Sequence, residues 1–526
     1  MHVKFDYLPG KKKAVVISPY LQTIRLHFSE EDKAAGFVKR YYNRGSGEFS
    51  DRKYNITPSG VFDIGLTLEI LSFLKSKNIP FNIEYTEAFK KAFPTPYYFK
   101  DSPLVPLRNP ENFQQRDYQD ESVKKALGVG NGIFHMTTAA GKTFIMCKLV
   151  QTIRFYEDVK VFIIVPTLQL VNQTYKDFVN YGVKISDITK WTGSDKRDPD
   201  AKITIANQAI IKDNLENIEF YNSIGLVIVD ETHLLKRSSK ICKIFKFFNT
   251  NHRYGFTGTL PESDVDRWNV IGLIGPVIYK VERSDMVDKG FIADVSVKIV
   301  TITYKDSPKY VSLKDVNYAT VATKPSEQGE LFSEEPTTTE DEYGEVGGED
   351  EGPTTLSHNY YLENEFADNH PFKLNVIKSI LSKLQKNSII MVDRISQGET
   401  ILKLLSDVKD KEVFFIRGDV EVEERERIRS LMEKQDNIIC IAMSKIFSTG
   451  INISNIHYIV FLSTGKSRVK IIQSIGRGIR LHKRKDCLYL IDIVDNLRYG
   501  ERHIQKRKLL YEGENFKISN TQIQEP

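Results

Sequence analysis

Three short runs of residues, widely separated in the chain, have the types and spacing needed to bind and hydrolyse a nucleoside triphosphate. In the first, Ala140-Gly141-Lys142-Thr143, a glycine turn, a lysine and a hydroxyl can hold phosphate groups and a magnesium ion. The second, Asp230-Glu231-Thr232-His233, offers one carboxylate for magnesium and another to accept a proton from water. The third, residues 473–480, carries two arginines that can neutralise charge on a transferred phosphoryl group. Their order predicts an NTP-driven machine assembled across two domains.

The first run lies in the local context that a phosphate-binding loop requires. Residues 132–136 predict a buried strand, residues 137–143 the loop, and the apolar residues that follow a helix. Loop amides and a helix N-terminus then point at the anion, with Lys142 reaching the β- and γ-phosphates and Thr143 binding magnesium. The match is imperfect, because Met136 stands where the pattern has its first glycine. The residues expected to contact the nucleotide here are Thr138, Ala139, Ala140, Gly141, Lys142 and Thr143.

The second run follows an apolar strand and so lies at the carboxyl end of that strand, where ligands bind in open α/β sheets. We expect Asp230 to hold magnesium through its water shell and Glu231 to act as general base toward the attacking water. His233 is interpreted as a link between the nucleotide state and the second domain, with a packing or capping role as the alternative. The hydroxyls of Thr257-Gly258-Thr259 could connect Glu231 and His233 to the domain interface.

Tyr118 and Gln119 are candidates for contact with the base of the nucleotide. They precede the first helix of the ATP-binding domain, where Tyr118 could stack on a base and Gln119 could read its edge. An ordinary surface pair is the alternative interpretation.

The second domain offers a loop and a helix. Gly450 and Asn452 belong to a loop after a strand, and this loop could touch both nucleotide and nucleic-acid backbone. Gln473 begins a helical stretch in which Arg477 and Arg480 are three residues apart and therefore share one face. Two guanidinium groups on one face suit fork-like contacts with phosphate oxygens, and an exposed basic helix is the alternative.

The elements that must position these residues are strands and helices in alternation. Fully apolar strands between helices indicate a parallel sheet covered on both faces, and two α/β domains of similar design are therefore expected. The apolar runs lie at residues 132–136, 159–165, 203–206 and 225–230, and again at 388–392, 412–416, 437–442, 457–462 and 487–492.

Composition suggests the domain boundaries. Residues 1–100 read as a small α+β accessory domain, and prolines between 94 and 110 mark its end. We expect the first motor domain at 111–300, a linker at 301–365, the second motor domain at 366–510 and a flexible tail at 511–526. Within the linker, residues 324–355 have almost no apolar side chains and predict a disordered acidic insertion. This insertion is either a solvated spacer or a competitor of nucleic acid for the chain's own groove.

Charge favours a polyanion partner. The chain of 526 residues has a formal net charge of +5, and residues 326–351 contribute eleven acidic side chains without a lysine or arginine. The remainder therefore carries +16, which suits nucleic acid, with plain solubility as the alternative.

Cysteine usage and hydropathy suggest the compartment. The four cysteines are scattered without CxxC spacing and read as buried reduced thiols. No apolar run has the length of a membrane span, and the first residues do not form a signal core. We expect a soluble cytoplasmic protein without a membrane partner.

These motifs together resemble those of the superfamily 2 helicases, over residues 111 to 495. The resemblance implies tandem RecA-like parallel-sheet motor domains, ATP and Mg²⁺ as cofactors, and roles for Lys142, Asp230, Glu231, Arg477 and Arg480 in hydrolysis. The matching segments are 116–119, 138–143, 165–173, the DExH run 230–233, 257–259, 449–452 and 473–480.

The chain is more closely similar to the recombination DNA helicases of the T4-type phages. The similarity rests on the glycine-poor phosphate loop, on Phe447-Ser448-Thr449-Gly450, on residues 466–477, and on the end of the N-terminal domain near residues 62–65. That family implies a monomer that remodels branched DNA by fork regression and junction migration. It also implies an N-terminal DNA-binding domain and phage or host replication and recombination proteins as partners, in the host cytoplasm. The acidic insertion departs from its pattern.

Three alternatives stay open. An RNA helicase shares the same motifs, and an ATP-switched nucleic-acid clamp or annealing factor would retain them with little motor activity. A restriction-enzyme motor subunit is less favoured, because no nuclease constellation follows residue 480.

Overall fold

The computed structural model forms two compact units, Met1–Lys289 and Gly290–Pro526. The residues described are 2–32, 52–108, 115–193, 195, 198, 200–310, 353–408, 410–418, 420–444, 453–462, 468–479, 482, 485 and 487–526. Across these residues we find no helix that combines the length and the apolar character of a membrane span.

The first unit begins with a small α+β region, as the sequence predicts. Its main sheet has the strand order β5-β2-β1-β6, and β3 and β4 form a separate pair. The strands are β1 (His2–Leu8), β2 (Lys13–Ile17), β3 (Ser29–Glu31), β4 (Arg52–Tyr54), β5 (Val61–Phe62) and β6 (Asn82–Tyr85). The helical segments are α1 (Leu21–His27), the 3₁₀ turn η1 (Ile64–Leu66), α3 (Thr67–Ser76) and α4 (Glu87–Ala92).

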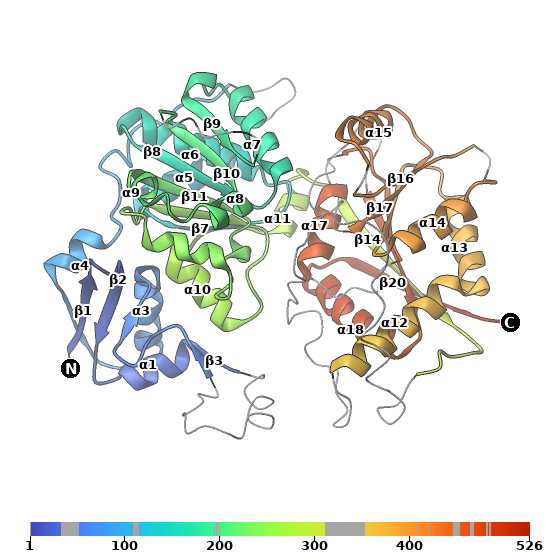
Figure 1. Cartoon of the computed structure of the whole chain (residues 1–526), viewed down its shortest axis with the longest axis horizontal. Coiled ribbons are helices and arrows are strands. Elements are labelled where there is room, and N and C mark those ends of the chain that lie inside the picture. Colours follow the sequence, from blue (N-terminus) through green and yellow to red (C-terminus); the bar gives the residue numbers. More distant parts are fainter. Residues whose placement is uncertain are drawn as a thin grey trace. The chain divides into compact units, whose positions relative to one another are not determined.

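This N-terminal region shares a hydrophobic core with the sheet that follows it. Phe28 packs edge-on against Trp268, with ring centroids 4.8 Å apart. Gly65 in η1 lies against the backbone at Gly272 so closely that a Cβ at either residue would clash. Figure 1 shows η1 and α3 beside α10 (Asp264–Ile274), which carries Trp268 and Gly272. The N-terminal region is therefore built into the first unit.

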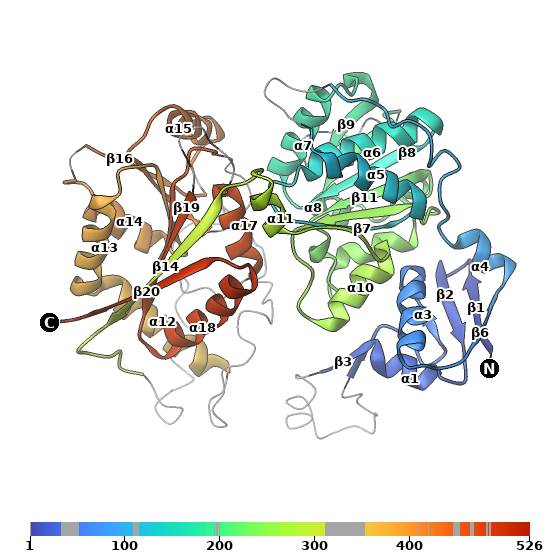
Figure 2. The ribbon, with the colours of Figure 1, turned by 180° about the vertical axis from the view of Figure 1, so that it is seen from behind.

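The first motor domain is a seven-stranded, fully parallel sheet with the order β13-β7-β12-β11-β8-β10-β9. Its central strands are buried along most of their length because helices pack on both faces, as Figures 1 and 2 show. The strands are β7 (Gly132–Met136), β8 (Lys160–Val165), β9 (Ile188–Trp191), β10 (Ile203–Asn207), β11 (Ile224–Asp230), β12 (Arg253–Thr257) and β13 (Val277–Val281). The helices are α5 (Asp117–Val129), α6 (Lys142–Tyr156), α7 (Leu168–Asn180), α8 (Gln208–Asp213), α9 (Ile218–Asn222), α10 and α11 (Arg283–Asp288). The 3₁₀ segments are η2 (Ile185–Asp187), η3 (Thr232–Leu234) and η4 (Lys240–Lys246).

The second unit contains a second seven-stranded parallel sheet, with the order β16-β17-β15-β18-β19-β14-β20. The α/β fold class with two parallel-sheet motor domains is confirmed. The strands are β14 (Asp294–Thr303), β15 (Ser388–Val392), β16 (Glu412–Ile416), β17 (Ile438–Met443), β18 (Tyr458–Phe461), β19 (Cys487–Asp495) and β20 (Lys517–Gln524). The helices are α12 (Pro353–Asn369), α13 (Pro371–Lys383), α14 (Ile395–Leu404), α15 (Val422–Lys434), α17 (Arg468–Gly478) and α18 (Arg498–Gly513).

Two segments of the second unit differ from the sequence-based expectation. Residues 511–526, expected to be a flexible tail, complete α18 and form β20, which pairs with β14 over eight residues. Figure 2 shows β20 alongside β14. Most side chains of β20 are polar, and its sequence lacks the apolar pattern of a buried strand. β20 is therefore a strand because it pairs with β14. β14 itself belongs to the second sheet, although residues 294–300 were expected in the first motor domain.

The acidic insertion lies mostly outside the described residues, which resume at Pro353 in α12. The expected linker, 301–365, includes the end of β14 and most of α12. Both elements belong to the second unit, which begins at Gly290.

Candidate nucleotide-binding site

The phosphate loop connects the buried strand β7 to helix α6. The loop ends at Gly141, whose φ of +80° places it in the left-handed region, and α6 begins at Lys142. Ala139 also has a positive φ, of +66°, where glycine would be unstrained. The turn leaves the first amides of α6 without helical partners, so the loop fits a phosphate group.

Three side chains from the start of α5 hold this loop in place. The Arg116 guanidinium donates to the Ala139 carbonyl at 2.6 Å, and the Tyr118 hydroxyl donates to the Ala140 carbonyl at 2.6 Å. Gln119 accepts a hydrogen bond from the Arg116 amide at 3.0 Å, which caps α5. The Gln119 side-chain amide also donates to the Ala140 carbonyl, at 3.5 Å. Tyr118 and Gln119 are buried and brace the loop, and their contact with a base stays a prediction. Sequence reasoning missed the Arg116 brace, because a side-chain bond to a loop carbonyl leaves no pattern in the sequence.

A cavity of about 140 Å³ lies beside Tyr118. Its walls include Glu121, Tyr279 and Met286, and the Tyr279 hydroxyl donates to Glu121 at 2.9 Å. No sequence pattern indicated this cavity, because Tyr279 and Met286 reach it from β13 and α11.

Lys142 and Thr143 occupy the first turn of α6. The Lys142 ammonium lies 3.5 Å from the Met136 carbonyl, and no carboxylate in the described part of the chain forms an ion pair with it. Thr138, Lys142 and Thr143 are half-buried. An ammonium group that forms no ion pair, at the end of a phosphate loop, fits the β- and γ-phosphates of a nucleotide.

Asp230 and Glu231 stand at the carboxyl end of β11. Glu231 has a φ of +51°, and its amide donates to an Asp230 oxygen at 3.0 Å. Burial raises the pKa of Asp230, and the neighbouring Glu231 charge raises it further, while Lys142 acts in the opposite sense. A carboxylate whose pKa is raised and that lies next to a second carboxylate is a site that a cation would stabilise.

His233 links Glu231 to the loop after β12. Its Nδ1 atom lies 3.0 Å from the Thr257 hydroxyl and 3.3 Å from a Glu231 oxygen. The Thr257 hydroxyl in turn donates to the Thr259 carbonyl at 2.5 Å. The hydroxyl connection expected from the sequence is therefore present within the first unit, from Glu231 through His233 to Thr257.

The strand order explains why these groups meet. β12 lies between β7 and β11 in the sheet, so the phosphate loop, the Asp230-Glu231 pair and Thr257 follow three neighbouring parallel strands at one edge. Asp230 and the Thr143 hydroxyl supply the hard oxygen ligands that Mg²⁺ prefers. The residues present therefore fit a magnesium ion bound together with nucleotide phosphates.

The predicted residues of the second unit are only partly described. Gly450, Asn452 and Arg480 lie outside the described residues, and Gln473 and Arg477 are described as backbone positions on α17. α17 ends at Gly478, so it does not continue to Arg480 as predicted. The Lys485 ammonium donates to the Gly478 carbonyl at 2.7 Å, and a Cβ on Gly478 would meet Leu488. Gly478 is therefore closely packed at the end of α17.

Two family models match the chain. The model described as "Type III restriction enzyme, res subunit" matches residues 112–262, and the model described as "Helicase conserved C-terminal domain" matches residues 372–482. The two matches fall in the two parallel-sheet domains.

Named relatives and solved structures agree with these matches. The chain is 26% identical to the ATP-dependent DNA helicase uvsW of Enterobacteria phage T4, over 72% of this chain and 68% of the relative. It is 24% identical to the DNA 3'-5' translocase XPB2 of Sulfurisphaera tokodaii, over 73% of this chain and 82% of the relative. The structure of the DNA-bound type ISP restriction-modification enzyme LlaBIII is similar over 86% of this chain and 34% of that chain. Its TM-score is 0.54 at 13% identity, which shows a shared fold.

Proposed function

The chain belongs to the superfamily 2 helicases and is an ATP-dependent helicase, and from this premise we propose that its substrate is DNA. The names of the phage T4 and Sulfurisphaera relatives both specify DNA, and the basic composition outside the acidic insertion suits a polyanion. ATP hydrolysis at this site is supported by one observation above all. The side chains of Lys142, Asp230, Glu231 and Thr257 lie together at one edge of the first sheet.

In the proposed reaction, Glu231 accepts a proton from the attacking water, and the water oxygen forms a bond to the γ-phosphorus. The bond from that phosphorus to the β–γ bridging oxygen breaks, which releases ADP and inorganic phosphate. Lys142 neutralises charge on the β- and γ-phosphates while the Gly141 turn presents backbone amides. Thr143 and Asp230 would hold a magnesium ion, which would supply positive charge against the negative charge that develops on the phosphates.

The residues of the second unit complete the proposal. Arg477 and Arg480 serve as arginine fingers, a role that accounts for roughly 10³–10⁵ in rate in related phosphoryl-transfer enzymes. Gln473, Gly450 and Asn452 contact the nucleotide or the nucleic-acid backbone. DNA affinity that differs between the ATP-bound and the ATP-free protein would then convert hydrolysis into movement along DNA.

For the biological role, we propose remodelling of branched DNA, by fork regression and junction migration, in recombination, replication and repair. The support is the similarity of the phosphate loop and of residues 466–477 to the T4-type phage enzymes. On the same basis we propose a monomer that works with phage or host replication and recombination proteins in the host cytoplasm.

ATP turnover measured with a panel of nucleic acids tests the proposal. Forked and four-way DNA should stimulate turnover more than single-stranded DNA, blunt duplex or structured RNA. The Lys142→Ala variant should show no stimulated turnover with any of them. Stronger stimulation by structured RNA would support the RNA helicase alternative, and DNA binding without stimulated turnover would support the ATP-switched clamp.

A further inference from the structure

Three lysines form a row along one side of the 3₁₀ segment η4. Lys240, Lys243 and Lys246 are exposed, whereas Ile241 and Ile244 face the hydrophobic core. A 3₁₀ helix has three residues per turn and rises about 2 Å per residue, so residues three apart lie directly above one another at about 6 Å. The three ammonium groups can therefore follow a straight line, which an α-helix with the same spacing would not give.

Contacts at its carboxyl end hold η4 in this conformation. The Lys12 ammonium donates to the Phe247 carbonyl at 2.9 Å, and the Arg253 guanidinium donates to the Phe245 carbonyl at 3.3 Å. Runs of 3₁₀ helix longer than about four residues are uncommon, and η4 has seven. The row is therefore set by the surrounding fold and not by local preference alone.

The charge of this row is not compensated within the described part of the chain. None of Lys240, Lys243 and Lys246 forms an ion pair with a described residue. The N-terminal region adds further positive charge at the end of the row, because Lys12 is fixed there by Phe247 and by Asn249 Oδ1 at 2.7 Å. Its neighbour Lys11 is exposed.

The row is separate from the nucleotide site. Arg253, which binds the Phe245 carbonyl, is the first residue of β12, so η4 lies toward the amino ends of the strands. The phosphate loop and Asp230 lie at the carboxyl ends.

We infer that Lys240, Lys243 and Lys246, with the exposed Lys11 beside them, bind the sugar–phosphate backbone of double-stranded DNA. This inference rests on the proposed function. Single-strand sites combine positive charge with exposed aromatic side chains on which bases stack. Among described residues 235–249, the aromatic side chains are buried or half-buried, and none is an exposed stacking surface. A line of cations without stacking rings is suited to the regular phosphates of a duplex.

The salt dependence of duplex binding tests this inference. We would compare the wild type with the variant Lys240→Gln/Lys243→Gln/Lys246→Gln, using a fluorescent blunt duplex and anisotropy over a series of KCl concentrations. Each phosphate contact contributes about 0.9 to the slope of log K against log salt for B-DNA. The slope should become shallower by about 2.7, and affinity near 0.1 M salt should fall on the order of 10²-fold.

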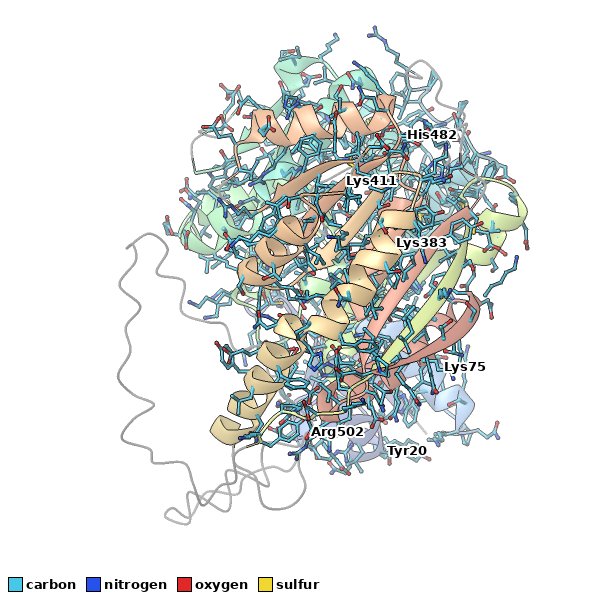
Figure 3. All side chains as sticks on the ribbon, turned by 90° about the vertical axis from the view of Figure 1, so that its right-hand side faces the viewer. Tyr20, Lys75, Lys383, Lys411, His482 and Arg502 are labelled. Atoms are coloured by element: carbon cyan, nitrogen blue, oxygen red, sulfur yellow. The ribbon has the colours of Figure 1, made fainter. Side chains whose placement is uncertain are left out.

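Two further variants keep the result interpretable. Lys240→Arg/Lys243→Arg/Lys246→Arg retains the charges and should keep the wild-type slope. Lys124→Gln/Lys383→Gln/Lys403→Gln removes three exposed lysines from three different helices and should also leave the slope unchanged. Figure 3 labels Lys383, at the end of α13.

The outcomes separate this inference from the proposed function. A wild-type protein that does not bind DNA contradicts the proposed function itself. A wild-type protein that binds, together with a triple glutamine variant of unchanged slope, overturns only the lysine row. A slope that changes with single-stranded DNA but not with duplex overturns the duplex assignment.

Discussion

Acidic residues lie on the buried parallel strands of both units, but their surroundings differ. On β19 of the second unit, Asp492 accepts from Arg507 at 2.9 and 3.0 Å and from the Tyr511 hydroxyl at 2.8 Å. Asp495 is paired with the buried Lys373 at 2.7 Å. At the end of β11 in the first unit, Asp230 has no lysine or arginine partner among the described residues, and burial raises its pKa.

The presence or absence of an ion pair distinguishes carboxylates with a structural role from carboxylates that are suited to bind a ligand. A buried charge is costly unless it is paired, so the β19 carboxylates are compensated by permanent cations from the same unit. Asp230 forms no ion pair with a lysine or arginine of the described residues, and a magnesium ion would supply positive charge there. Four substitutions would break or sharpen this comparison.

The largest expected effect is on turnover in Glu231→Gln. Loss of the general base should lower the rate of DNA-stimulated ATP hydrolysis by about 10²–10⁴-fold. Stability should not fall, because the substitution removes a like charge beside Asp230. Steady-state ATP turnover and thermal melting would be measured together.

Glu262→Gln, at an exposed position of the same unit, is the matched control and should change neither quantity. If Glu231→Gln instead lost stability while turnover persisted, Glu231 would be a structural acid like those of β19.

Asp492→Asn should give the opposite result. It leaves the buried Arg507 guanidinium without its counter-charge, which should cost about 3–5 kcal/mol of unfolding free energy. Urea denaturation of the full chain would measure it. Turnover per folded molecule should stay at the wild-type level.

Glu501→Gln, on the exposed side of α18, is the control for this experiment and should be neutral. Replacing the whole cluster by Asp492→Leu/Arg507→Leu/Tyr511→Phe should recover most of the loss, since no buried charge is then left unpaired. A stable Asp492→Asn variant would contradict the structural role of this pair.

The sequence alone predicts the proposed catalytic pair, Asp230 and Glu231, better than the buried Asp492–Arg507 pair. Asp230 and Glu231 could be found because an apolar strand delivers them directly after a phosphate-loop pattern, and local spacing carries that signal. The partners of Asp492 could not be found, because Arg507 and Tyr511 come from α18, whose sequence shows only a basic, amphipathic helix. Which lysine or arginine is buried depends on tertiary packing.

Two further differences have the same origin. β20 lacks an apolar pattern and is a strand because β14 pairs with it. The hydrogen bond from the Tyr118 hydroxyl to the Ala140 carbonyl could not be predicted either, and stacking of Tyr118 on a base stays a prediction. Motif spacing indicates that a residue belongs to a site, but not what its side chain contacts.

A smaller effect is expected from Thr257→Val, which tests the connection from Glu231 through His233. Valine keeps the shape but removes the hydroxyl that lies 3.0 Å from His233 Nδ1. A hydrogen bond of this kind contributes about 0.5–1.5 kcal/mol, so turnover should fall by about 2- to 13-fold. The rate of DNA-stimulated hydrolysis would be measured at saturating ATP.

Thr204→Val is the matched control, because Thr204 is a buried threonine on β10. It should leave turnover unchanged. Equal losses in both variants would mean that the Thr257 hydroxyl matters only for packing.

The smallest expected effect concerns backbone strain, which also differs between the units. In the second unit the non-glycine residues with positive φ are, within the described residues, Asp410, Asn437 and Asn515, types that tolerate this conformation. In the nucleotide site, Ala139 and Glu231 also have a positive φ, and these residue types do not tolerate that conformation as asparagine and aspartate do.

Ala139→Gly should therefore raise the unfolding free energy slightly. The left-handed conformation destabilises the folded alanine protein by about 1–2 kcal/mol, and glycine removes this strain. Glycine also stabilises the unfolded chain by about 0.5–1 kcal/mol through its larger conformational entropy, so the net gain in unfolding free energy should be about 0.5–1 kcal/mol. The neighbouring Ala140→Gly should be destabilising by a similar amount, because Ala140 does not have a positive φ and is fully buried. Urea denaturation of the two variants should give changes in unfolding free energy of opposite sign. A loss of stability in both variants would show that the loop holds Ala139 without strain.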